Sequence, residues 1–118
     1  MIAALPIRQR RATTKDELKE LVRAWAAAVK VSPRRVQIQE MRRKWASCSS
    51  TGTLTFSADL LAEPMEFQEY VIVHELLHLI APNHGRVFRA LLRVYLPEWR
   101  AEDASHCGFA RLTTSESG

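Results

Sequence analysis

Two histidines and a glutamate stand close together in the middle of the chain, at His74, Glu75 and His78. Residues four apart lie on one face of an α-helix, with Cβ atoms about 5–6 Å apart, so both imidazoles can direct a nitrogen at one metal ion. Glu75 lies one step round the helix, where a general base belongs. If these residues served only as core packing, burial of the Glu75 carboxylate would lower the stability of the fold, because a buried charge needs a partner. The pattern predicts one Zn²⁺ ion on His74 and His78, with Glu75 activating a zinc-bound water to attack a carbonyl.

A catalytic zinc site needs a third protein ligand and an open position. His84 is the first candidate, because Pro82 stops the helix and Asn83 tolerates the left-handed conformation that would let the chain turn back. The spacing equals that of the metzincin pattern, but Ala81 stands where glycine is usual and no methionine follows for a Met-turn. Three alternative third ligands remain open, namely Glu98, Glu102 and His106.

Three helices are predicted, and one of them carries the histidines. The segment 65–80 is apolar on nearly all sides, which predicts a central, buried helix. An earlier helix begins at the capping box of Thr14 and Glu17 and ends before Pro33. A third helix is expected over 84–95. Its predicted inner face consists of Val87, Phe88, Leu91, Leu92 and Tyr95.

The strand signals are shorter. Alternation over 36–41 and a β-rich run at 53–56 flank a turn signal at 49–52, which predicts a hairpin with a long tip. A further strand is expected at 3–10. The order of elements indicates an α+β fold, in which a small antiparallel sheet of about three strands packs against three helices. We expect a single domain over 1–118, with a basic segment at 1–12 and a flexible polar tail at 108–118.

Charge is unevenly distributed along the chain. Residues 1–50 contain 12 Lys/Arg and 4 Asp/Glu, whereas residues 51–118 contain 5 and 9. A basic first half suggests nucleic acid as a partner, although an ordinary solvated surface explains it as well. No apolar run is long enough to cross a bilayer, and the arginines follow the first apolar residues instead of preceding them, so we expect a cytoplasmic protein with no membrane partner. The pattern predicts no oligomeric state.

Two separated motifs resemble the YgjP-like metallopeptidases, relatives of the SprT-like and Wss1-like zinc proteases. The first motif runs from Tyr70 to His78 and continues at Asn83-His84-Gly85 and Phe88; the second is the segment 44–49 with Gly52-Thr53-Leu54 and Phe56. The resemblance covers about residues 34–100. It implies a minimal zincin fold with a central HExxH helix, a sheet whose edge strand lines the cleft, and three histidine ligands at His74, His78 and His84. Departures lie outside the zinc motif, at Lys44, Ala46 and Ser57, where Arg, Gly and Asn are usual.

Further candidates surround the motif. The strand containing Thr53, Leu54 and Thr55 precedes the metal helix and could pair its backbone with an extended substrate. Tyr95 or His106 could stabilise the oxyanion of a tetrahedral intermediate. Cys48 could reach the zinc as an inhibitory thiolate, although an ordinary buried or turn thiol is the simpler interpretation.

Two functions follow from these features. The first is a zinc-dependent metallopeptidase that acts on a peptide or protein. The second is a metal-stabilised module that binds nucleic acid through its basic half, and a nucleic-acid-associated, SprT-like protease would combine the two.

Overall fold

The computed structural model describes residues 12–81, 83 and 85–96. Its elements follow in the order α1 (Lys15–Val29), β1 (Arg35–Gln39), β2 (Ala46–Cys48), β3 (Thr53–Ser57), the 3₁₀ helix η2 (Ala58–Ala62), α2 (Met65–Leu77) and α3 (Arg86–Tyr95). The predicted α+β class with three helices is confirmed. The strand predicted at 3–10 lies outside the described residues.

The sheet is mixed, with the strand order β1-β3-β2, so the predicted antiparallel sheet and hairpin are wrong. β1 runs parallel to β3, with Arg35 opposite Thr53 and Gln39 opposite Ser57. The turn at 49–52 instead joins β3 to the short antiparallel strand β2. β2 has only three residues and no apolar alternation, so its sequence contains no periodic strand signal.

α1 forms through local signals at both ends. The Thr14 hydroxyl accepts a hydrogen bond from the Glu17 amide at 3.1 Å, and the Glu17 carboxylate accepts one from the Thr13 amide at 2.8 Å. These bonds satisfy amide groups that the helix itself leaves unpaired. At the other end Lys30 adopts a left-handed conformation with φ of 68°, which ends the helix.

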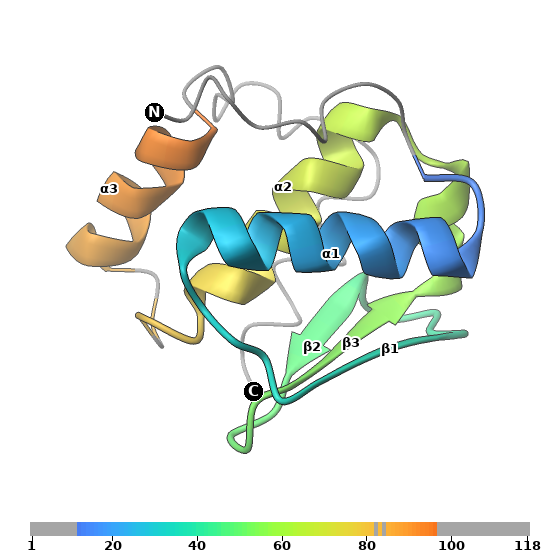
Figure 1. Cartoon of the computed structure of the whole chain (residues 1–118), viewed down its shortest axis with the longest axis horizontal. Coiled ribbons are helices and arrows are strands. Elements are labelled where there is room, and N and C mark those ends of the chain that lie inside the picture. Colours follow the sequence, from blue (N-terminus) through green and yellow to red (C-terminus); the bar gives the residue numbers. More distant parts are fainter. Residues whose placement is uncertain (1–11, 82, 84, 97–118) are drawn as a thin grey trace.

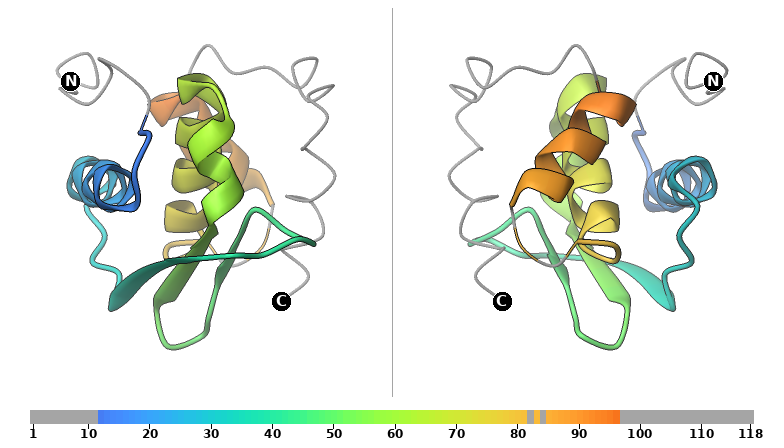
Figure 2. Two further views of the ribbon diagram at one scale, coloured as in Figure 1. Left: turned by 90° about the vertical axis from the view of Figure 1, so that its right-hand side faces the viewer. Right: turned by 90° about the vertical axis from the view of Figure 1, so that its left-hand side faces the viewer.

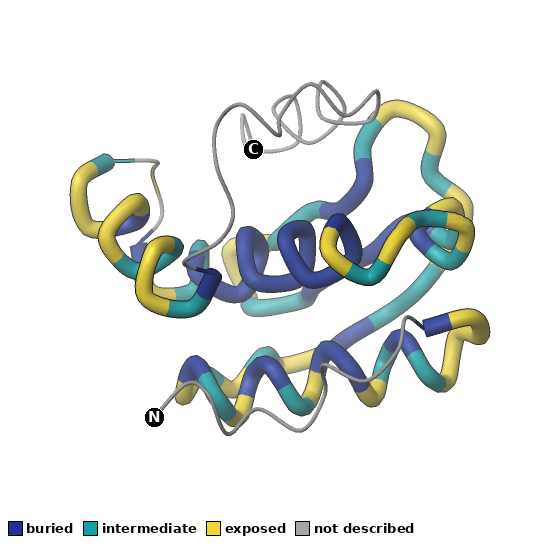
Figure 3. The backbone as a smooth tube through the Cα atoms, turned by 90° about the horizontal axis from the view of Figure 1, so that it is seen from above, coloured by how far each residue is buried: buried dark blue, intermediate teal, exposed yellow. Residues whose placement is uncertain are grey.

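α2 lies between α1 and α3, with the sheet beside its C-terminal half (Figures 1 and 2). Every residue from Phe67 to Leu77 is buried, as the dark central helix of Figure 3 shows. Gln68 ties this helix to its surroundings, because its amide group donates to the carbonyls of Ala12 and Leu60 and accepts from the Ala12 amide. Burial on all sides is therefore confirmed for Phe67–Leu77, whereas Glu66 and Ile80, near the two ends of the predicted segment, are exposed.

α3 is attached much more loosely. Phe88 is its buried residue, and Leu91, Leu92 and Tyr95 are partly buried. The prediction that Val87 lies on the inner face is wrong, because Val87 is 60% exposed. It lies about 100° round the helix from Phe88, the residue that is buried. No helix among the described residues is long and apolar enough to cross a membrane.

Candidate metal centre

His74 and His78 present their imidazoles to each other at the C-terminal end of α2. Their Nε2 atoms are 3.3 Å apart, and their ring centroids are separated by 4.9 Å. His74 is 5% exposed and His78 is partly buried. Both rings therefore direct the same nitrogen toward one point at the margin of the core.

This nitrogen separation fits one zinc ion. Zinc binds imidazole nitrogen at about 2.0–2.1 Å in tetrahedral geometry, which sets two such nitrogens about 3.3 Å apart. Two neutral imidazoles are also donors that zinc prefers. Within 12–81, 83 and 85–96, no group of three His, Cys, Asp or Glu side chains is placed to hold a metal. The predicted third ligand, His84, lies outside the described residues, as do Glu98, Glu102 and His106.

The backbone at the end of α2 keeps the two histidines in line. The amides of His78, Leu79 and Ile80 bond to carbonyls three residues back, at 3.2, 3.0 and 2.9 Å. The α-helix therefore ends at Leu77, and a tighter 3₁₀-type turn begins at His78. The sequence had predicted a helix up to residue 80. His78 itself keeps helical angles, with φ of −65° and ψ of −18°, so its side chain stays above His74.

Aromatic rings hold the two imidazoles in place. Phe88 of α3 contacts both, with centroid distances of 5.1 Å to His74 and 5.0 Å to His78. Tyr70, one turn earlier on α2, lies 5.7 Å from His74. In the sequence, Phe88 belongs both to the predicted inner face of the third helix and to the motif that resembles the YgjP-like family. Its position against both histidines comes from the packing of two helices and has no local signal.

Glu75 and Cys48 interact electrostatically. Glu75 is 2% exposed on α2, and Cys48 is the last residue of β2. Burial raises the pKa of the Cys48 thiol above its ordinary value, and the negative charge of Glu75 raises this pKa further. The thiol contacts the Ser49 carbonyl at 3.6 Å. The Cys48 side chain is therefore a neutral thiol within electrostatic range of the Glu75 carboxylate.

Thr53, Leu54 and Thr55 do not have the free backbone that a substrate-pairing strand needs. They lie in β3, which pairs with β1 on one side and with β2 on the other. Leu54 is also fully buried, and the Thr55 hydroxyl accepts from the Gln37 side chain at 3.3 Å. The prediction that this strand pairs with substrate is therefore wrong, because the sheet uses both of its edges.

β2 lies at the edge of the sheet next to α2, and within the part of the chain that the structure describes no further strand pairs with this open edge. Ser57 donates to the Trp45 carbonyl at 2.8 Å, and Ser49 donates to the Thr53 carbonyl at 2.9 Å. Hydrogen-bonded pairs alternate along an antiparallel ladder. The backbone groups of Ala46 and Cys48 consequently point away from β3, toward the open edge.

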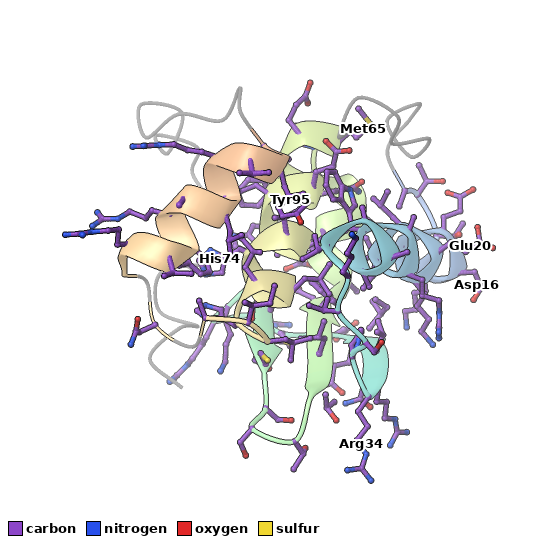
Figure 4. The ribbon with its side chains drawn as sticks, turned by 60° about the vertical axis from the view of Figure 1, so that its left-hand side comes forward. Asp16, Glu20, Arg34, Met65, His74 and Tyr95 are labelled. Carbon is purple, nitrogen blue, oxygen red and sulfur yellow. The ribbon has the colours of Figure 1, made fainter. Side chains whose placement is uncertain are left out.

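Tyr95 is at the far end of α3 from the histidines. It follows Phe88 by seven residues, which places it about 10 Å further along the helix axis. Tyr95 and His74 can be located by their labels in Figure 4. The α3 residue whose ring contacts His74 is Phe88. The structure thus does not bring Tyr95 to the histidine pair, and the other oxyanion candidate, His106, lies outside the described residues.

The profile of the YgjP-like metallopeptidase domain matches residues 4–105. The chain belongs to the YgjP-like family. The resemblance found in the sequence is thereby confirmed, and membership identifies a metallopeptidase-type hydrolase. A search of curated proteins gave no significant match.

Two solved structures share the fold of this YgjP-like chain. The metallopeptidase zymogen jannalysin of Methanocaldococcus jannaschii is 27% identical, with a TM-score of 0.64 over 75% of this chain and 86% of that one. The metallopeptidase zymogen abylysin of Pyrococcus abyssi is 24% identical, with a TM-score of 0.63 over 73% and 86%. Both are similar to this chain over the greater part of its length.

Proposed function

We propose that this chain is a zinc peptidase whose metal is held by His74, His78 and His84. The observation that carries the proposal is the 3.3 Å separation of the two Nε2 atoms beside the buried carboxylate of Glu75. Family membership supports the reaction class, and the sequence position of His84 supports the third ligand. A bound zinc would supply Lewis acidity to the scissile carbonyl and to the attacking water.

Glu75 is the general base in this proposal. Its carboxylate takes one proton from the water whose oxygen attacks the peptide carbonyl carbon. It then delivers that proton to the amine nitrogen as the C–N bond breaks. Burial strengthens this role, because a carboxylate shielded from bulk water interacts more strongly with nearby charge and protons.

The substrate is a peptide or protein segment in an extended conformation. We place it on the open edge of β2, in place of the predicted β3 edge, because the backbone groups of Ala46 and Cys48 face outward there. An extended segment can add to such an edge through main-chain hydrogen bonds. This arrangement brings the substrate next to Cys48, the residue whose pKa is raised in part by the charge of Glu75.

Replacing Glu75 with Gln tests the proposal. The amide keeps the size of the side chain but removes the base, so zinc content measured by mass spectrometry should stay at one ion per chain. Hydrolysis of a quenched fluorescent peptide should fall at least about 100-fold. The control is Glu66→Gln, which removes an exposed carboxylate from the first turn of the same helix and should leave the rate unchanged.

Retained hydrolysis in zinc-loaded Glu75→Gln protein would contradict the assignment of the base. Because jannalysin is described as a zymogen, the assay is repeated after limited proteolysis. A zinc-loaded wild-type chain that cleaves none of a diverse peptide library in either form would contradict the peptidase itself. His74→Ala should lose the zinc and the activity together.

A further inference from the structure

A cleft opens between the C-terminal half of α1 and the beginning of β1. Its volume is about 480 Å³, within the usual range for small-molecule sites. Its lining includes Arg23 of α1, Arg34 just before β1, and Arg35, the first residue of β1. All three arginines are exposed. No residue of α2, β2 or α3 lines this cleft, so it is separate from the metal centre.

The three arginines bring positive charge to one opening. No acidic residue lines the cleft, and no ion pair of these arginines is found within the described part of the chain. Asp16 and Glu20 of α1 lie away from Arg34 in Figure 4. Glu20 precedes Arg23 by one helical turn, but it is not among the residues that line the cleft. Like charges held near one another repel, and a bound anion relieves that repulsion.

Backbone hydrogen bonds at the C-terminus of α1 reduce the repulsion that free helix carbonyls would exert on an anion. The Ala26 carbonyl accepts hydrogen bonds from the amides of Lys30 and Val31, so it is already occupied. The position of Arg34 is also held, because its amide donates to the Gly52 carbonyl at 2.9 Å. Two separate elements therefore present guanidinium groups from anchored backbone.

We propose that this cleft binds a small phosphorylated ligand. Guanidinium groups match phosphate oxygens in a forked geometry, and the Ser32 hydroxyl in the lining is a further donor. Val31 and Val36 form an apolar wall against which the organic part of the ligand can pack. Among the described residues the lining contains no aromatic side chain, which disfavours a nucleic acid strand held by base stacking.

Binding of pyrophosphate, measured by calorimetry at fixed salt, tests the proposal. The variant carrying Arg23→Gln, Arg34→Gln and Arg35→Gln should bind at least about 10-fold more weakly than wild type, because three charge-assisted contacts are lost. The matched control carries Arg86→Gln, Arg89→Gln and Arg93→Gln on exposed positions of α3. It loses the same charge and should bind within about twofold of wild type.

Three outcomes would overturn the proposal. Equal weakening in both triple variants would mean that net charge alone attracts the anion. Unchanged binding in the cleft variant would place pyrophosphate elsewhere, including at the metal. Failure of pyrophosphate, with cleft-dependent binding of a 20-nucleotide single strand, would replace the small ligand with nucleic acid phosphates. Circular dichroism of each variant confirms that the fold is intact, and the result is independent of peptidase activity.

Discussion

The helices α1 and α2 are stable for different reasons. α1 has a side-chain cap at its N-terminus and a backbone cap at its C-terminus, and it alternates buried with exposed residues. α2 has no side-chain cap and is buried from Phe67 to Leu77. Local sequence is enough to start and stop α1. α2 depends on its neighbours for stability, and its polar residues Glu75 and His74 are buried with it. An all-buried helix is a costly place for such groups, so their presence there points to chemistry.

The largest expected effect is in the core of α2. Ile72 is fully buried, and Ile72→Ala should lower the free energy of unfolding by about 2–5 kcal/mol, because a cavity remains. If α2 depended on local preference as α1 does, alanine would instead stabilise it slightly. Urea unfolding measures the difference. Ile80→Ala is the control, because Ile80 is 46% exposed just after the helix and should change stability by less than about 1 kcal/mol.

Alkaline pH should affect α2 through Tyr70. Burial raises the pKa of Tyr70 to about 12. Below pH 10 the phenol is neutral in both states and contributes no pH dependence. Between pH 10 and 12 the unfolded chain ionises first, so stability falls by up to about 2.7 kcal/mol as pH rises through this window.

Tyr70→Phe should remove this loss. Unfolding is measured in urea at pH 9 and at pH 11.5 for both proteins, and the drop between the two pH values should be smaller in the variant. An equal drop in both proteins would show that Tyr70 ionises as readily in the folded protein as in the unfolded chain. Such a result would also contradict the inference that α2 is buried away from water around Tyr70.

The smallest effect is expected at the N-terminus of α1. Thr14→Ala removes the hydroxyl that accepts from Glu17 and should cost about 1 kcal/mol. Thr14→Ser keeps an acceptor and should change stability by a few tenths of a kcal/mol. Thermal unfolding of the two variants compares them directly. Equal stability would mean that α1, like α2, is stabilised by packing more than by its cap.

Sequence patterns predicted the features that depend on neighbours along the chain. The capping of α1 by Thr14 and Glu17 and the burial of the segment around His74 follow from helical periodicity, which is local. The four-residue spacing of His74 and His78 also determines which face they share. Family resemblance extended these patterns to a metallopeptidase, as the matched profile bears out.

Tertiary structure decided what depends on contacts between distant segments. β1 pairs with β3 in parallel because β2 occupies the hairpin position, and a three-residue strand leaves no periodic signal. Phe88 contacts both imidazoles across two helices, and the charge of Glu75 on α2 acts on Cys48 of β2. Arg23 and Arg34, from separate segments, line one cleft. Sequence therefore determined the helix that carries His74, Glu75 and His78, while packing decided what surrounds it, because side-chain periodicity describes one element at a time.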